Sequence, residues 1–362
     1  MKQFLTIVIF ILGLTICSCD SKHHASSSTS NETSQPERNV EAVENKVGTV
    51  QNIVAQIEAG NRVESSHIGI AGSPSSQWDL YKQLKNSATT EQLIDLTDHR
   101  NGAVKCYAFH ALASKRSDKL FPVLLKHLYD TSTIETQSGC IVMTELVGDY
   151  FLNVVTPNYI DLDVYKLSES ERRIVDSILV NDKSILLYSK SSVLQDLKPT
   201  LENYNRIREL VIKDRNQSAL ITLAKYKKNE DKKLISSFFA DRETQYSALF
   251  AVREYPDQYF FPFVKKAFEQ EWEYSEQRGY DYPKWRMCYQ ALAKYPNPET
   301  LKMFERTLQT KDEFRYNTLC TNLMTAITKY PNKLYDHIKQ RIRLPENYLN
   351  DVKEQLNYEN EL

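Results

Sequence analysis

The chain has 362 residues, with 46 basic and 47 acidic side chains, so its formal net charge is −1. A balance this close to neutral argues against a protein that holds nucleic acid through bulk positive charge, and we expect no nucleic-acid partner. Only nine glycines occur, and Gly279 is the only one after Gly148. Long glycine-poor runs of Lys, Glu, Leu and Ala are typical of helices, so the composition predicts a mostly helical protein.

The amino terminus is predicted to be a targeting segment. Lys2 precedes an apolar run from Phe4 to Leu14, which has the length of a signal peptide and is too short to span a membrane. The next residues, Ile16-Cys17-Ser18-Cys19, resemble the bacterial lipobox, with Cys19 as the acylated residue. An ordinary secretory signal with incidental cysteines is the alternative. We therefore expect residues 1–18 to be a lipoprotein signal peptide and Cys19 to carry lipid.

This expectation fixes a location as well as a modification. A lipidated Cys19 anchors the protein in the cell envelope, on the inner or outer membrane, facing the periplasm or the exterior. Stable anchoring takes more than one acyl chain. Residues 19–43 are rich in Ser, Thr, Asn and Glu, with little to bury, and are predicted to be a disordered tether.

Residues 44–89 are predicted to form amino-terminal capping helices. One apolar stripe has helical spacing and ends at Gly60; it comprises Val47, Val50, Ile53, Val54 and Ile57. Residues 60–76, which contain three glycines and a proline, are predicted to be a loop. The next helix is expected to begin around Trp78.

The segment 285–308 predicts a two-helix hairpin with a tight corner. Apolar residues from Met287 to Tyr295 lie three and four positions apart, as one face of a helix requires. Pro296 ends this helix, because proline lacks the N–H that a helix interior uses. Asn297, followed by Pro298 and Glu299, has the pattern of a helix start.

The corner of this hairpin recurs along the chain. Its tyrosines fall at positions 226, 255, 295 and 330, at intervals of 29, 40 and 35 residues, and proline follows all but the first, where Lys227 stands instead. Irregular repeats of this length indicate stacked helix pairs, because no single pair can bury its apolar face alone. We therefore predict an all-α fold, an α-solenoid of helix pairs over residues 90–345, closed by a carboxy-terminal capping helix at 346–362.

One short irregular or β-containing insertion is predicted near residues 131–161. The β-branched residues around Gly139 favour a short strand or extended loop, and a helix capped by Asp149 is preferred to a second strand for residues 150–155. Insertions in solenoids tend to cluster on a binding face. After it, Ser168 and Glu171 have the spacing of a capping box, and a further helix is expected at 184–197.

The segment from Gly102 to Ala113, GAVKCYAFHALA, is similar to the second helix of a HEAT-type repeat. The whole chain resembles HEAT-repeat lipoproteins of the Gram-negative envelope, especially those of Bacteroidota, over roughly residues 90–345. This resemblance implies a fold and a location. It implies no reaction, because that family has none assigned.

No pattern in the chain predicts catalysis, a cofactor or a metal site. Cys106, Cys140, Cys288 and Cys320 lack a Cys-x-x-Cys spacing, and the histidines at 99, 110 and 127 lack a metal-binding spacing. Cys106, Cys288 and Cys320 are expected to be buried thiols, although one disulfide stays open. Glu271 and Glu273 are interpreted as part of a solvated charged face. We therefore expect a protein that is not an enzyme.

The second helices of the repeats are basic and almost free of acids. In HEAT-like solenoids these helices line the concave surface, so the resemblance implies an electropositive face that binds a protein or peptide partner, including an acidic one. The candidate contact residues are Lys105, Lys225, Arg286, Lys294, Arg315 and Lys329. The alternative is that these cations only complement the negative ends of helix dipoles.

A second function is kept open at this point. An envelope lipoprotein that captures nutrients would bind a glycan or a peptide on exposed aromatic rings. The nearest supply surrounds the glycine-bearing loop at Gly279 and comprises Trp272, Tyr280, Tyr282 and Trp285. This alternative requires those rings to be exposed.

Overall fold

The computed structural model describes residues 40–156 and 163–361. The predicted signal peptide, Cys19 and most of the tether lie outside these residues. The chain forms two units, Met1–Asn45 and Lys46–Leu362, and the second contains every strand and every helix from α2 onward. In the described part, no helix combines the length and the apolar character that crossing a bilayer requires.

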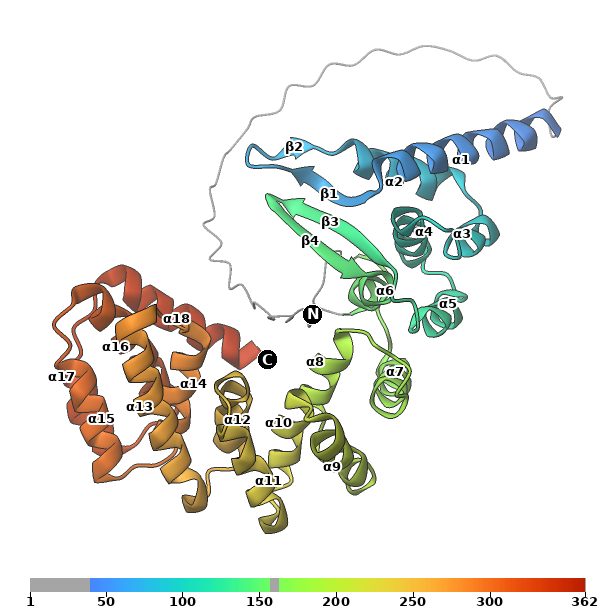
Figure 1. The fold of residues 1–362 in the computed structure, drawn as a ribbon. Helices are drawn as coiled ribbons and strands as arrows, with labels where there is room; N and C mark the ends of the chain where they lie inside the picture. Colours follow the sequence, from blue (N-terminus) through green and yellow to red (C-terminus); the bar gives the residue numbers. More distant parts are fainter. Residues whose placement is uncertain (1–39, 157–162, 362) are drawn as a thin grey trace. The chain divides into compact units, whose positions relative to one another are not determined.

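The described chain is mostly helical, as predicted, and carries one small sheet (Figure 1). The elements before the first long break in the helical pattern are α1 (Val40–Gly60), β1 (Arg62–Ile68), β2 (Ser73–Pro74), α2 (Ser76–Ser87), α3 (Thr90–Leu96), α4 (Gly102–Ser114) and α5 (Leu120–His127). Then follow β3 (Thr133–Gly139), β4 (Ile141–Leu146) and α6 (Val147–Val155). Up to residue 156, the expected insertion at 131–161 consists of a β-hairpin and the short helix that the sequence favoured, and residues 157–161 lie outside the described part.

The sheet has the strand order β2-β1-β3-β4, in which β1 and β3 run parallel and the other pairs antiparallel. The prediction of a loop for residues 60–76 is therefore wrong. Strand β1 pairs with β3, which lies some seventy residues further along the chain. Across this pair, Arg62 forms an ion pair with Glu135 at 2.7 Å. The backbone N–H of Glu64 also donates to the hydroxyl of Tyr107 on α4, at 2.8 Å, which ties the sheet to the helices.

Two helices after the sheet show how their ends are fixed. Helix α7 (Glu169–Asn181) begins with the predicted capping box between Ser168 and Glu171. Helix α8 (Ser189–Asp196) begins five residues later than residue 184, where the sequence predicted its start. The carboxylate of Asp149 accepts the backbone N–H groups of Tyr188 and Ser189, at 2.9 and 2.8 Å. Asp149 thus holds the start of α8, and the prediction that it caps its own helix is wrong.

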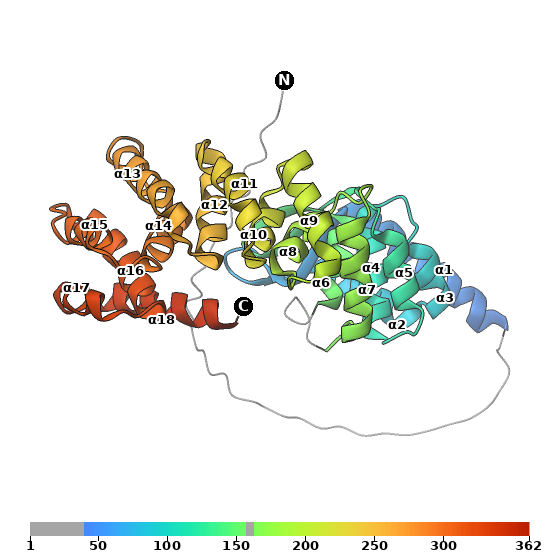
Figure 2. The same ribbon diagram turned by 90° about the horizontal axis from the view of Figure 1, so that it is seen from below.

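The remaining helices are α9 (Leu201–Asp214), α10 (Gln217–Lys225), α11 (Lys232–Ser236), α12 (Arg242–Glu254), α13 (Phe261–Arg278), α14 (Tyr282–Ala293), α15 (Pro298–Leu308), α16 (Glu313–Lys329), α17 (Asp336–Arg341) and α18 (Glu346–Glu361). Helices α10, α12, α14, α16 and α18 pack each on the next, while α9, α13 and α15 pack on α10, α14 and α16 (Figures 1 and 2). The start of α15 is as predicted, because the Asn297 side chain accepts the N–H groups of Glu299 and Thr300.

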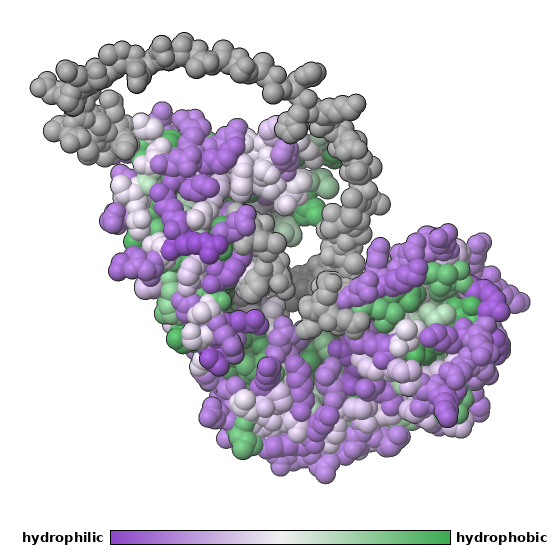
Figure 3. Space-filling view, turned by 180° about the vertical axis from the view of Figure 1, so that it is seen from behind, coloured by the Kyte–Doolittle hydropathy of each residue, from purple (hydrophilic) through white to green (hydrophobic). Residues whose placement is uncertain are grey.

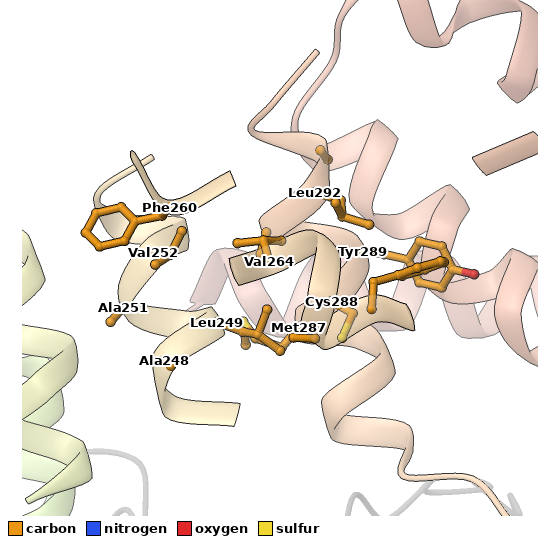
Figure 4. Close-up of a cluster of buried hydrophobic side chains, with 14 of the residues drawn as sticks. Ala248, Leu249, Ala251, Val252, Phe260, Val264, Met287, Cys288, Tyr289 and Leu292 are labelled. Atoms are coloured by element: carbon orange, nitrogen blue, oxygen red, sulfur yellow. The ribbon is translucent and has the colours of Figure 1, made fainter. Parts of the chain in front are cut away.

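Buried apolar side chains form two large clusters. One joins α1 to α7 and includes the sheet residue Ile134, and the other runs from Val180 to Ile342. Figure 4 shows part of the second, where Leu249 and Val252 of α12 face Val264 of α13 and side chains of α14. Burying a side chain of this size stabilises the fold by about 1.5–3 kcal/mol, so these contacts between neighbouring pairs dominate the stability.

The repeated corner tyrosines join the end of each second helix to the corner that precedes its helix pair. Tyr255 donates its hydroxyl to the side chain of Asn229 at 3.2 Å, and Tyr295 donates to the carbonyl of Asp257 at 3.2 Å. Tyr226 likewise donates to the carbonyl of Thr200 at 2.8 Å. A buried tyrosine needs a partner for its hydroxyl while its ring fills space. This double demand explains why the same residue type recurs at these corners.

Candidate functional site

The structure uses several of the predicted partner-binding cations inside the protein. Lys105 lies 2.7 Å from the carboxylate of Asp130, and both side chains are largely buried. Lys225 donates to the carbonyl of Gln195 at 2.7 Å, in the last turn of α8, where the helix dipole attracts a cation. These two lysines are therefore engaged by the fold, and the expectation that they face a partner is corrected.

The side chains of the two predicted arginines, Arg315 and Arg286, are also buried or partly buried. Arg315 is only 9% exposed; its guanidinium lies 4.7 Å from the ring centre of Trp272 and 3.6 Å from the carboxylate of Glu276. Arg286 is partly buried beside the fully buried Trp285. Arg315 thus fills a packing role, because its guanidinium covers an indole ring and is paired with an acid.

The remaining two predicted cations, Lys294 and Lys329, belong to a group that we call the corner cations, Lys227, Arg253, Lys294 and Lys329. They stand at or just beyond the carboxy-terminal ends of α10, α12, α14 and α16. Burial lowers the pKa of Lys294, and the positive charges of Arg253, Lys227 and Lys329 lower it further, against the opposite effect of Glu254. Four cations and one acid thus share one region of the surface.

Aromatic and polar contacts position these cations. The ammonium of Lys294 lies 4.4 Å from the ring centre of Tyr330, and that of Lys329 lies 5.9 Å from the same ring. Arg253 donates to the side chain of Gln290 on α14, at 2.6 Å, and pairs with Glu254. Cation–π contacts hold an ammonium in place without neutralising its charge.

Sequence reasoning found half of the corner cations and missed the other half. Lys294 and Lys329 were identified because each precedes a corner tyrosine on a basic helix. Arg253 was overlooked because Glu243 and Glu254 made its helix look balanced. For the helix that ends at Tyr226 the candidate was Lys225, whereas Lys227, in the place of the corner proline, adopts a left-handed backbone with φ of 53°. Relative to the corner tyrosine, Lys294 and Lys329 lie one residue before it, Arg253 two residues before it and Lys227 one residue after it, so the four cations share no single position in the repeat.

The aromatic alternative survives only in part. Trp285 is fully buried and Trp272 is 6% exposed, packed against each other and against Phe268, so the expectation that they form a ligand platform is wrong. Tyr280 and Tyr282 remain at the surface, and their ring centres are 6.0 Å apart. Phe314 of α16, which the sequence did not suggest, lies 5.7 Å from Tyr280 and is 52% exposed.

Tyr282 and Phe314 are exposed, and Tyr280, which contacts both rings, is half-buried against the core; we call these three residues the exposed aromatic set. Apolar side chains gather on this part of the molecule in Figure 3. A shallow hollow between α16 and α18 is lined by Tyr316, Leu344, Pro345 and Leu349, among others. The region could accept an apolar or planar group, although no charged side chain of the corner cations belongs to it.

The ionisable groups that are buried elsewhere have structural partners. Glu271, interpreted above as part of a solvated face, is fully buried and pairs with Lys284 and Arg242, whereas Glu273 is exposed. The four cysteines among the described residues are free; Cys106, Cys288 and Cys320 are buried, as expected, and Cys140 is exposed. Burial raises the pKa of Cys320 to about 12, which makes it a poor nucleophile. Among the described residues, no three side chains of the metal-binding types converge.

Comparison with known proteins does not assign the chain to a family. No protein-family model matches it, and no curated protein or solved structure matches it. Its function therefore has to be inferred from the corner cations and their surroundings.

Proposed function

We propose that the chain is a lipid-anchored, extracytoplasmic scaffold of HEAT-like helix pairs that binds an acidic protein or peptide partner and catalyses no reaction. One observation carries the proposal: the corner cations come from four successive helix pairs, and the charges of three of them lower the pKa of Lys294. Such a surplus of positive charge raises the local concentration of an acidic ligand and speeds its association.

The packing of the helices supports the solenoid part of this proposal. Each of α10, α12, α14 and α16 contacts the next, and the corner tyrosines at 255 and 295 bond to the corner that precedes their helix pair. In a solenoid of this kind the second helices form one continuous inner layer. The corner cations would then follow one another along that layer, one from each pair, and match acidic groups spaced along an extended partner.

A charge-reversal experiment tests the binding surface. The variant carrying Lys227→Glu, Lys294→Glu and Lys329→Glu should lose binding to a polyglutamate peptide, whereas its melting temperature should stay unchanged. Arg253 is left in place because its bond to Gln290 joins α12 to α14. Binding by the unaltered protein should also weaken as salt is added, since exposed charges are screened.

A matched control separates the surface from the general effect of charge. Lys302, Lys311 and Lys339 are exposed and lie outside the corners, so reversing all three changes the net charge by the same amount. This control should bind the peptide as the unaltered protein does. Equal loss of binding in both triple variants would refute the corner cations as the binding surface. Crosslinking in the native envelope, followed by mass spectrometry, would then identify the natural partner.

The lipid anchor is tested separately. A Cys19→Ser variant should move from the membrane fraction to the soluble fraction and should take up no labelled fatty acid. The unaltered chain should take up label and stay with the membrane, because several acyl chains anchor a protein stably. Label that is retained in the Cys19→Ser variant would assign the lipid to another residue.

The exposed aromatic set favours a second candidate function, the capture of a glycan or peptide. Planar rings at a surface can stack on a sugar face or on another ring. A Tyr282→Ala, Phe314→Ala variant should then lose binding on a glycan and peptide array. Tyr188→Ala provides the control, because Tyr188 is 52% exposed and does not belong to the set.

A further inference from the structure

Strand β4 lies at one end of the sheet order, so only one of its edges is paired. Its six residues pair with β3, from Thr133 opposite Leu146 to Ser138 opposite Ile141. No other strand in residues 40–156 or 163–361 pairs with its outer edge. Such an edge presents a row of backbone donors and acceptors that another strand can use.

The hairpin geometry shows which residues offer these groups. The two-residue loop Gly139-Cys140, with φ of 55° at Gly139, has the glycine that a type II′ turn places first. The pair that flanks such a loop, Ser138 and Ile141, exchanges hydrogen bonds, and the pairs then alternate along the strands. Ile141, Met143 and Glu145 therefore bond to β3, whereas Val142 and Thr144 direct their N–H and C=O groups outward.

The edge lacks the features that usually keep strands apart. Proteins protect open edges with lysine, proline or a β-bulge. Strand β4 contains no lysine and no proline, and its pairing with β3 has no register shift that would indicate a bulge. Val142 and Met143 are each 48% exposed, so two apolar side chains stand at the surface beside the free backbone groups. Glu145, the one acid of the strand, bonds to Thr136 and Asn153 of its own chain.

We propose that β4 pairs, antiparallel, with β4 of a second copy of this chain. A two-fold axis through Met143 places Val142 opposite Thr144 of the second copy, so the outward groups meet as two hydrogen-bonded pairs. Met143 then faces its own equivalent, and Glu145 faces Ile141 of the other copy. Like charges that face each other destabilise a strand pair, and this register places none opposite each other. The net charge of −1 per chain adds little repulsion between copies.

This self-complementarity is the reason for choosing a second copy over a foreign strand. The uncharged run Ile141–Thr144 offers no charge by which to select another sequence, whereas it matches itself in the register above. The joined strands would give one sheet of eight strands across two chains. The proposal is independent of the corner cations, which lie on other elements.

Charge pairs at the axis test the register directly. The full-length Met143→Lys and Met143→Glu variants should each be monomeric, because like charges would face each other across the axis. An equimolar mixture of the two should form a dimer that contains one copy of each, since the charges then attract. Mass by light scattering on a size-exclusion column measures both outcomes. A monomeric unaltered protein, or dimers that persist in both single variants, would overturn the proposal.

A disulfide provides a second readout that captures a short-lived pair. In a Cys140→Ser background, Met143→Cys should form a covalent dimer on mild oxidation, because non-hydrogen-bonded residues opposite each other have Cα atoms about 4.5 Å apart. The control is Ile70→Cys in the same background, since Ile70 is fully exposed at the tip of the β1–β2 hairpin and away from the axis. Equal crosslinking at both positions would mean random collision and would count against the proposed pairing.

Discussion

The ammonium of Lys284 lies 3.2 Å from the carboxylate of Glu271, and the two side chains are 2% and 0% exposed. The guanidinium of Arg242 bonds to the same carboxylate and covers the ring of Tyr274. One acid thus joins three successive helices, α12, α13 and α14. Burial lowers the pKa of Lys284, and the negative charge of Glu271 acts in the opposite direction.

This arrangement predicts unequal costs for its members. Glu271→Gln should lower the free energy of unfolding by about 3–5 kcal/mol, because two cations then lose their partner in a buried site. Lys284→Met should cost less, about 1–3 kcal/mol, since Arg242 still pairs with Glu271. Denaturant unfolding of both variants measures the difference. A larger loss for Lys284→Met would show that Arg242 does not hold the carboxylate.

Tyr335, which lies five residues after the corner tyrosine Tyr330, allows a test of a buried hydrogen bond between helix pairs. Tyr335 donates its hydroxyl to the carbonyl of Ala293 at 3.1 Å and is 1% exposed. Tyr335→Phe should lower the free energy of unfolding by about 1 kcal/mol, because one buried hydrogen bond is lost while the ring stays. Tyr282→Phe, at a side chain 49% exposed, should change it by less than about 0.5 kcal/mol. Similar losses at both positions would remove the hydrogen bond as the cause.

Two glycines next to the sheet should respond in opposite ways to an added methyl group. A Cβ at Gly148 would lie 2.7 Å from the carbonyl oxygen of His127 and 3.1 Å from that of Asp130, so backbone would have to move. Gly148→Ala should therefore cost about 1–3 kcal/mol. At Gly102 the nearest atom is 3.4 Å away, and Gly102→Ala should be neutral or stabilise α4 by up to about 1 kcal/mol. Thermal melting of the two variants side by side decides this.

Asp130 makes the stability sensitive to acid. Burial alone would raise the pKa of Asp130, but hydrogen bonds from His127, Lys105 and Ser132 outweigh it and hold the pKa well below its ordinary value. The unfolded chain therefore takes up this proton first, near the ordinary aspartate pKa of about 3.9. The contribution is present above that pH and is lost as the pH falls through the folded pKa.

The corresponding variant isolates this effect. Asp130→Asn should lower the free energy of unfolding by up to about 3 kcal/mol at neutral pH, because Lys105 is left without its acid. The difference between the two proteins should shrink as the pH falls below about 4. Melting temperatures measured from pH 7 to pH 3 test the slope. A difference that stays constant over this range would rule out the carboxylate as the titrating group.

Features that depend on neighbouring residues could be predicted from the sequence. The helix start at Asn297 and the capping box at Ser168 each lie within four residues, and both are confirmed. The insertion near Gly139 was also identified, since a glycine among β-branched residues is a local signal. The corner at Tyr255, Tyr295 and Tyr330 could be recognised because the same short pattern recurs.

Features that depend on distant partners could not be predicted. Strand β1 lies in a segment rich in glycine and serine, and only its pairing with β3 makes it a strand. Glu271 has the surroundings of an exposed acid along the chain, yet Lys284 and Arg242 arrive from two other helices to neutralise it. Asp149 was expected to cap its own helix, but its oxygens meet N–H groups almost forty residues later. Local sequence patterns do not indicate such contacts between residues that are distant in the chain.

The hydroxyls of Tyr226, Tyr255, Tyr295 and Tyr335 all donate to residues earlier in the chain. When the protein is synthesised, each acceptor has therefore left the ribosome before its tyrosine does. The acceptor is thus available when the tyrosine emerges, in keeping with the general tendency of chains to fold from the amino terminus during synthesis. The direction of these bonds is thus compatible with helix pairs of the carboxy-terminal half folding one after another during translation.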